Sequence, residues 1–313
     1  MMKKIIYLFL FVGLFIPFFT FADESDLTLA LSPIIMEVKV DPSSSKPQKI
    51  TVINKSKKAQ GIRIYAQNFF ASDEFGGMTF NNSSSSSYTA KDWLNFQKTN
   101  LVLAPQGQEN LIFTIQPPKE AEPGGHYAVI FFEPIKSSEF GQNSSLGITG
   151  RVGALLFITV NGQILEKGRV LGAQSSDKCS GVSCSFKTKK FREWGPVPFE
   201  FRFENTGNIH VKVKGKIEIY NLFRQKIAEI PVDEKTVLPK KTRYFDAKWL
   251  REPLLGYYKA KLTINYGSLS VADHAQTSFW AIPWRILLVF VGICLISAVF
   301  IKMRKSRRFR SVR

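Results

Sequence analysis

Residues 197–205 read Val-Pro-Phe-Glu-Phe-Arg-Phe-Glu-Asn, and their alternation is the clearest sign of how the chain folds. Phe199, Phe201 and Phe203 alternate with charged residues, so an extended backbone places all three rings on one face. Residues 34–40 show the same period of two, with Met36 and Val38 on the apolar face. This period predicts β-strands with one face in a core and the other in water.

Further segments of this kind occur on both sides of Asn161-Gly162, which is a strong signal for a two-residue turn. Before it we predict strands at 34–40, 48–54, 61–68, 110–115, 125–132 and 153–160. After it we predict strands at 197–204, 211–220, 228–232, 242–247, 257–266 and 271–279. Many short strands separated by turns are typical of β-sandwiches. The predicted fold is therefore all-β, with two tandem Ig-like β-sandwich domains at 23–165 and 166–280.

Four short patterns occur in the same order in both halves, which indicates an internal duplication. They are a strand that ends in asparagine (Asn54, Asn205), Ile-x-Ile-Tyr (62–65, 217–220), a corner that ends in proline (103–105, 237–239) and Gly-x-Tyr (125–127, 256–258). An Ig-type sandwich has a corner tyrosine whose hydroxyl bonds back to the backbone. Tyr127 and Tyr258 are predicted to have this role.

The first half is longer than the second at 70–100, between its tyrosine pattern and its proline corner. This insertion contains a serine run, Trp93 and Phe96. Loops on a rigid scaffold often carry function, and an exposed tryptophan offers a flat apolar face to a sugar ring. Trp93 and Phe96 are therefore predicted ligand contacts. The alternative is that the aromatic segment packs back onto the sandwich.

The amino-terminal segment has the features of a secretory signal peptide, which we place at 1–22. Lys3 and Lys4 precede an apolar run, and Thr20-Phe21-Ala22 fits a cleavage site of small residues. Cleavage there would start the mature chain near Asp23. Because the apolar run is long, an uncleaved anchor is the alternative.

A second apolar run, at 281–301, predicts one transmembrane helix. Residues 286–301 carry no charge, and Trp280 and Trp284 lie where an aromatic belt would form. The tail at 302–313 is basic, so the positive-inside bias places it in the cytoplasm and residues 23–280 outside the cell membrane. A buried core helix followed by a basic tail is the alternative.

The high net charge of +18 comes largely from these two ends. Ten of the 43 basic residues, and none of the 25 acidic ones, lie in 1–22 and 282–313, so the rest carries +8. We therefore do not read the charge as a sign of nucleic-acid binding. The remaining charge is compatible with anionic envelope polymers or with a solvated lysine-rich surface.

The chain has three cysteines. Cys294 lies in the predicted span, where it is a small apolar residue. Cys179 and Cys184 flank a glycine turn in a segment predicted to be extracytoplasmic, so they can close a small disulfide loop. A reduced pair without consequence is the alternative.

The sequence contains no recognisable catalytic, cofactor-binding or metal-binding motif. The three histidines, His126, His210 and His274, are far apart and in no metal-ligand spacing. The acidic pairs Asp73-Glu74 and Asp233-Glu234 are adjacent, and neighbours on a strand point to opposite faces. We therefore predict no catalytic residue, no cofactor and no metal, and a function that is not enzymatic.

The order of motifs resembles the membrane-anchored WxL-interacting proteins of bacterial surfaces, and the first domain is also similar to the leading domain of pilus chaperones. The resemblance rests on the following segments: 31–33, Trp93, 103–108, 123–130 and 151–156, followed by a second β-domain, a membrane helix and a basic tail. For that family it implies a first domain that binds peptidoglycan and a second that engages a protein partner.

Two functions are predicted from these features. The first is a membrane-anchored cell-surface scaffold that binds cell-wall polymer, partner surface proteins or both. The alternative is a chaperone-like module that offers an edge strand to an assembling surface or pilus subunit. An unpaired first strand at 27–40 would favour the alternative, and an aromatic groove around Trp93 would favour polymer binding.

Overall fold

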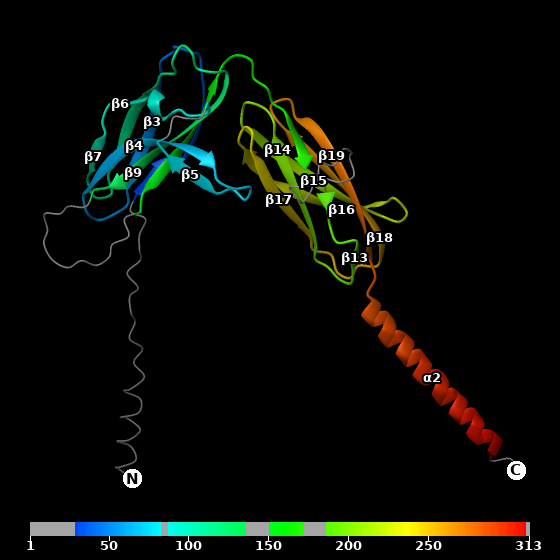
Figure 1. Ribbon diagram of the computed structural model, residues 1–313. Coiled ribbons are helices and arrows are strands. Elements are labelled where there is room, and N and C mark those ends of the chain that lie inside the picture. Colours follow the sequence, from blue (N-terminus) through cyan, green and yellow to red (C-terminus); the bar gives the residue numbers. More distant parts are fainter. Residues whose placement is uncertain (1–28, 83–86, 136–149, 172–185, 311–313) are drawn as a thin grey trace, which may run out of the picture.

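The chain is described by a computed structural model that covers residues 29–82, 87–135, 150–171 and 186–310. The predicted signal peptide and the predicted Cys179–Cys184 disulfide lie outside these residues. Two elongated β-sandwiches meet at an angle and are followed by one long helix (Figure 1). The predicted all-β, Ig-like architecture with a carboxy-terminal apolar helix is confirmed.

The first sandwich consists of two sheets with the strand orders β1-β3-β8-β6 and β2-β10-β9-β4-β5, and β7 also pairs with β4. A short 3-10 helix, η2 (Lys91–Trp93), precedes β6. The strands are β1 (Leu29–Ser32), β2 (Ile35–Val40), β3 (Lys46–Asn54), β4 (Gln60–Ala71), β5 (Met78–Asn81), β6 (Leu94–Phe96), β7 (Asn100–Leu103), β8 (Gln108–Ile115), β9 (Gly124–Pro134) and β10 (Val152–Val160).

The second sandwich also has two sheets. In one, β14 pairs with β17 on one side and with β11 and β12 on the other; the second has the order β13-β19-β18-β15-β16. The strands are β11 (Gly168–Leu171), β12 (Phe186–Lys187), β13 (Phe191–Arg192), β14 (Val197–Asn205), β15 (Val211–Asn221), β16 (Lys226–Val237), β17 (Thr242–Trp249), β18 (Gly256–Tyr266) and β19 (Val271–Ala281).

The first strand of each sandwich changes from one sheet to the other. In the first sandwich, β1 pairs with β3, the chain turns at the cis Ser32-Pro33 bond, and β2 then pairs in parallel with β10. In the second, β11 and β12 pair with β14, and β13 then pairs in parallel with β19. After the change of sheet, the opening strand of each domain therefore lies beside the last one: β2 beside β10, and β13 beside β19.

The alternating side chains fill the space between the sheets as the sequence predicts. Phe199, Phe201 and Phe203 are completely buried in the core of the second sandwich. In the first, strands β9 and β10 are apolar on both faces because they serve two clusters. One face lies in the sandwich core, and the other carries Tyr127, Val129, Phe131 and Phe157, which cluster with Phe69 of β4. We call this outer group the aromatic cluster.

Two buried asparagines make the same kinds of hydrogen bond in the two halves. The Asn54 side-chain amide donates to the carbonyls of Lys58 and Leu103 at 2.8 and 3.4 Å, and Asn205 donates to those of Ile209 and Val237 at 2.7 and 2.9 Å. Each side-chain oxygen also accepts the backbone N–H two residues later. The asparagine and proline-corner patterns therefore occupy equivalent positions.

The prediction for the corner tyrosines is correct for Tyr258 and wrong for Tyr127. The Tyr258 hydroxyl donates to the carbonyl of Leu255 at 3.0 Å, as a corner tyrosine does. Tyr127 lies instead in the aromatic cluster, on the opposite face of its sheet, and His126 is the neighbour on the core-facing side of β9. Because side chains alternate along a strand, an alignment error of one residue exchanges the faces.

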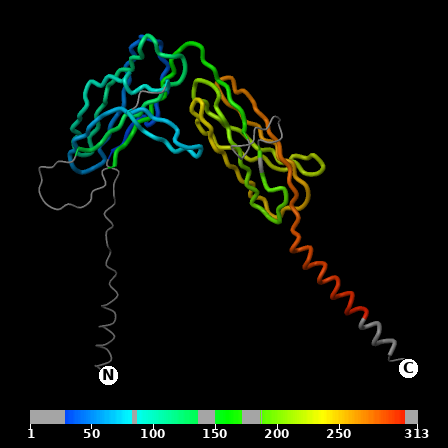
Figure 2. The backbone as a smooth tube through the Cα atoms, viewed as in Figure 1, coloured from blue at the N-terminus to red at the C-terminus, as the bar shows by residue number. Residues whose placement is uncertain are grey.

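The Asn161-Gly162 pair follows β10 and leads into the second sandwich, and β10 and β11 do not pair with each other, so the predicted two-residue turn is wrong. Its residues instead bind the end of β2. The N–H of Asn161 donates to the carbonyl of Val40, and its side chain to Asp41, at 2.9 and 2.7 Å. Figure 2 follows this connection between the two sandwiches as a continuous green tube.

The helix α2 (Trp284–Arg310) begins almost directly after β19. Its segment Trp284–Lys302 has a mean hydropathy of 2.5 and none of it is buried against the described protein, so it is a candidate membrane span. The alternative of a buried core helix is therefore wrong.

Candidate strand-binding edge and cleft

Strand β2 lies at the edge of its sheet, with β10 as its neighbour on one side. Leu155 N–H donates to the carbonyl of Ile34, and Asn161 N–H to that of Val40. The backbone groups of successive strand residues point alternately to the two sides of the strand. Since Ile34 and Val40 bond towards β10, the even-numbered residues of β2 bond to β10. The backbone groups of Ile35, Glu37 and Lys39 therefore point away from the sheet.

Among the described residues no other strand pairs with this outer side of β2. The side chains of Ile35, Glu37 and Lys39 are also exposed. Of the residues that the structure describes, Lys46 alone bonds to these outward backbone groups: its ammonium donates to the carbonyl of Lys39 at 2.8 Å. A lysine beside an edge strand is a common obstacle to uncontrolled strand pairing. The edge is thus available for pairing over most of its length, with a polar side chain at one end.

The open edge borders a cleft of about 1010 Å³ between the two sandwiches. Residues 37–39 and Lys46 form one wall, and Lys212 and residues 267–269 of the second sandwich form the other. Leu269 is 85% exposed there, which provides an apolar surface opposite β2. An extended segment lying along β2 would therefore contact both sandwiches.

Polar contacts join the two walls of the cleft. Lys212 Nζ lies 2.7 Å from Glu37 Oε1, which links β15 to β2 across the cleft. The backbone N–H of His210 donates to the Tyr127 hydroxyl at 2.9 Å, and His210 Nδ1 lies 3.3 Å from the same hydroxyl. Burial lowers the pKa of His210 to about 4, so the imidazole is neutral at pH 7 and Nδ1 can accept a hydrogen bond from the Tyr127 hydroxyl.

Further contacts join the two sandwiches beside the cleft. The aromatic cluster of the first sandwich packs against Leu238 of the second. The His210 ring lies 4.9 Å from that of Phe157. Asn208 adds two polar contacts, since its carbonyl accepts the N–H of Gly125 and its amide donates to the carbonyl of Pro123.

A second contact between the sandwiches comes from the insertion at 70–100 in the first half. The hairpin of β4 and β5 extends from the first sandwich towards β17 of the second (Figure 1). At its tip, both carboxylate oxygens of Glu74 bind the Arg202 guanidinium, each at 2.6 Å. Tyr244 N–H donates to the carbonyl of Glu74 at 2.7 Å, and the Phe75 ring lies 5.2 Å from that of Tyr244. Arg202 holds the pKa of Glu74 below its usual value.

The structure places Trp93 and Phe96 against the first sandwich. Both are partly buried and pack on its core, and the Trp93 ring lies 4.4 Å from that of His126. Burial lowers the pKa of His126, so the imidazole is neutral at pH 7. The hollow beside His126 is lined by Tyr88, Glu122 and Asn208 among others and does not include Trp93. The role of Trp93 and Phe96 as ligand contacts stays a prediction.

Replacing Trp93 with alanine separates the two hypotheses for this residue. We expect the free energy of unfolding to fall by about 1–3 kcal/mol, because a partly buried ring loses its contact with His126 and the core. Thermal unfolding and co-sedimentation with purified peptidoglycan would be measured on the same samples. An unchanged melting temperature with at least tenfold weaker sedimentation would instead identify a ligand contact.

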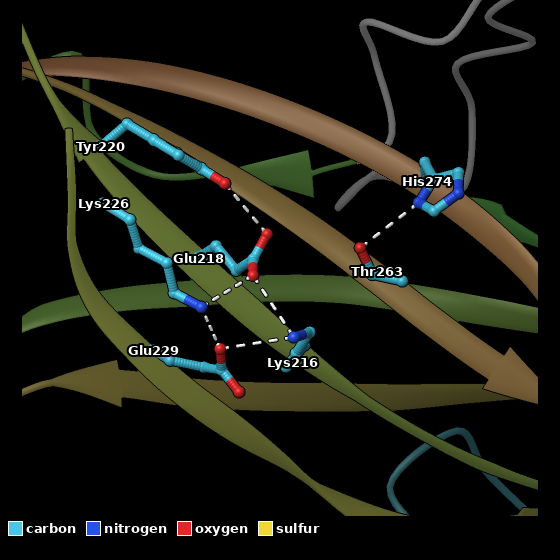
Figure 3. A network of polar contacts seen from close by, with 7 residues as sticks. All are labelled: Lys216, Glu218, Tyr220, Lys226, Glu229, Thr263 and His274. Atoms are coloured by element: carbon cyan, nitrogen blue, oxygen red, sulfur yellow. Dashed lines mark hydrogen bonds and ion pairs between the residues drawn. The ribbon is translucent and has the colours of Figure 1, made fainter. Parts of the chain in front are cut away.

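A network of ion pairs covers the outer face of β15 and β16 (Figure 3). Lys226 binds Glu218 at 2.9 Å and also binds Glu229, and Lys216 lies 3.3 Å from both carboxylates. The hydrogen bond from the Lys226 ammonium is the largest of the effects that lower the pKa of Glu218 to about 2. The two lysines and two glutamates balance one another in charge, so the network is not a free charged site; the two strands themselves are joined by their backbone pairing.

Within the described residues, no group of three or more His, Cys, Asp or Glu side chains is placed to hold a metal ion. The pairs that join the domains, Glu37–Lys212 and Glu74–Arg202, were not predicted from the sequence. Their members are far apart in the chain, and no local pattern indicates that they meet.

No family model matches the chain, and no curated protein matches it. Among solved structures, the class 5 fimbriae chaperone CfaA is similar with a TM-score of 0.44 and 14% identity, covering 80% of this chain and 98% of that one. The E. coli chaperone DraB is similar with a TM-score of 0.37 and 11% identity, covering 81% and 98%. The Pseudomonas aeruginosa CupB2 chaperone gives 0.35 and 10%, covering 78% and 97%. These similarities assign no function to this chain.

Proposed function

We propose that this protein is a membrane-anchored, non-enzymatic binding module that holds an extended segment of a partner protein as an added strand along β2. This is the chaperone-like alternative that the sequence predicts. The observation that carries it is the open edge of β2 beside the cleft. Ile35, Glu37 and Lys39 each offer an N–H and a carbonyl on this side, and within the described part of the chain only the carbonyl of Lys39 has a hydrogen-bond partner there.

Strand addition uses the backbone for affinity and the side chains for selectivity. The backbone groups of Ile35, Glu37 and Lys39 would supply the hydrogen bonds that give affinity. Across the cleft, Leu269 and the Glu37–Lys212 pair would contact alternate side chains of the added segment. Because the aromatic cluster and the Glu74–Arg202 pair fix the sandwiches relative to each other, this surface is formed before a partner arrives.

The other hypotheses have less support. Polymer binding depends on an aromatic groove around Trp93, and that ring packs against His126 instead. An enzymatic function would need acidic side chains and a histidine gathered in a pocket. His210 and Glu37 line the same cleft, but His210 already contacts Tyr127 and Glu37 is paired with Lys212. With the charge bias of the tail, we place residues 23–280 outside the membrane, where partner surface proteins would be met.

The proposal is tested by replacing Lys39 with proline. Proline removes the outward N–H of Lys39 and leaves the bonds from β2 to β10, because those come from even-numbered residues. The matched control is Lys248→Pro in β17. The N–H of Tyr244 points outward from β17 to Glu74. Lys248 lies four residues later on the same strand, so its N–H points to the same side. The control therefore removes an outward N–H from a different exposed edge.

The probe is the tightest peptide selected from a phage-displayed library of random peptides against the whole chain in nanodiscs. We expect its affinity, measured by calorimetry, to fall at least tenfold with Lys39→Pro and to be unchanged with Lys248→Pro. Hydrogen exchange at residues 35, 37 and 39 should slow when the peptide binds. Equal affinity for both variants, or protection confined to other strands, would refute strand addition along β2.

A further inference from the structure

The exposed apolar side chains of the second sandwich gather at one end. Among its described residues from 166 to 282, ten large hydrophobic residues are exposed, and eight of them lie at the end from which α2 leaves. Six belong to turns or short strands: Phe191, Trp194, Leu222, Phe223, Leu250 and Leu255. Trp280 and Ile282 are the other two, and only Leu269 and Val271 lie at the cleft end.

The strand register shows that these six residues share one end of the sandwich, although they come from three stretches of the chain, at 191–194, 222–223 and 250–255. Trp249, just before Leu250, pairs with Val197 at the start of β14. Asn221, just before Leu222, pairs with Tyr258 at the start of β18. Gly256, just after Leu255, pairs with Ala281 at the end of β19, and Phe191 pairs with Trp280. We call this end, formed by the turns at 193–196, 222–225 and 250–255 and by Phe191, the apolar end.

The apolar end is joined closely to the candidate membrane span. Only Ile282 and Pro283 separate β19 from α2. The N–H of Ile282 donates to the carbonyl of Arg192 at 2.8 Å, and Arg285 Nε in the first turn of α2 lies 3.4 Å from Glu193. A connection this short and this well bonded keeps the apolar end next to the first turn of the helix.

The charges on this surface suit a layer of lipid headgroups. Lys189, Lys190, Arg224 and Arg251 are exposed around the apolar residues, and Glu252 is the exposed acid among them. Large apolar and aromatic side chains surrounded by basic ones are characteristic of surfaces that insert into the headgroup region. A single exposed hydrophobic residue needs no explanation, but eight at one end do.

We propose that the apolar end of the second sandwich is seated in the headgroup region of the bilayer, so that the domain and not the helix alone contacts the membrane. The occupant of this surface is a phospholipid bilayer. The inference rests on α2 spanning that bilayer and is independent of strand binding at β2. It implies that the sandwich stands on the membrane surface in a fixed orientation, with its cleft at the far end.

The test uses the whole chain in vesicles of phosphatidylcholine and phosphatidylglycerol, with nitroxide labels at single cysteines. Cys179, Cys184 and Cys294 are first replaced by serine. Phe223→Cys reports on the apolar end, and Leu269→Cys is the matched control, because these positions are 78% and 85% exposed at opposite ends of the domain. Val289→Cys reports on the helix itself. Accessibility to oxygen, which concentrates in lipid, is compared with accessibility to a water-soluble nickel complex.

We expect the ratio of oxygen to nickel accessibility to be several-fold higher at 223 than at 269, and highest at 289. A water-like ratio at 223 with a lipid-like ratio at 289 would overturn the proposal while leaving the membrane span intact. Water-like ratios at both positions would overturn the span and the proposal together. Low accessibility at 223 to both reagents, with dipolar broadening between labels, would show a second copy of the chain and also overturn it.

Discussion

Replacing Asn205 with alanine is expected to lower the free energy of unfolding of the second sandwich by about 3–5 kcal/mol. The side chain is completely buried and satisfies the carbonyls of Ile209 and Val237 and the N–H of Gly207. Alanine leaves all three groups without this partner in a region closed to water. Asn54→Ala should have a similar effect on the first sandwich, because it makes the equivalent bonds.

Chemical denaturation followed by fluorescence measures both effects. Asn100→Ala, at an exposed position in β7, is the control and should change the free energy by less than about 0.5 kcal/mol. If either buried asparagine behaved like this control, the equivalence of the two halves at these positions would be wrong.

The Glu74–Arg202 pair is expected to couple the two sandwiches by about 1.5–3 kcal/mol. The geometry is bidentate, and the two side chains are only 27% and 16% exposed. A double-mutant cycle with Glu74→Ala and Arg202→Ala measures this coupling from the unfolding of the chain. Removing the pair should also widen the range of angles between the sandwiches, which small-angle X-ray scattering would detect as a larger radius of gyration.

The pair formed by Arg169 and Glu204 provides the comparison. It lies within the second sandwich, has a similar distance of 2.7 Å, and is 66% and 30% exposed. Exposed pairs typically couple by less than about 1 kcal/mol. An equally small coupling between Glu74 and Arg202 would mean that the hairpin of β4 and β5 does not fix the domain angle.

The sequence predicts the parts of this structure that depend on local periodicity. Phe199, Phe201 and Phe203 face the core because a strand alternates its faces. The asparagine pattern is correctly aligned because it marks a strand end followed by a turn of defined length. Tyr127 is misplaced because Gly-x-Tyr in the two halves differs by one residue in register, and no local signal reveals such a shift.

The candidate site is less predictable, because it depends on residues that are far apart in the chain. Nothing near Glu74 or Glu37 in the sequence indicates that arginine or lysine from the second sandwich will face them. The insertion at 70–100 was recognised, but its hairpin contacts the other domain and its aromatic residues pack inward. The open edge of β2 becomes visible only once its pairing with β10 is known.

The pairing of β2 with β10 and of β13 with β19 has a consequence for the order in which the domains fold during synthesis. Strand β2 pairs with β10, and β13 pairs with β19. Neither sandwich can therefore form all its strand pairs until the whole of its domain has left the ribosome. Contacts so distant in the chain form slowly, since loop closure precedes them. For the second sandwich the delay is longer, because β19 ends just before α2. Its last strand leaves the ribosome just ahead of α2, so this domain is completed only as the candidate membrane span itself is synthesised.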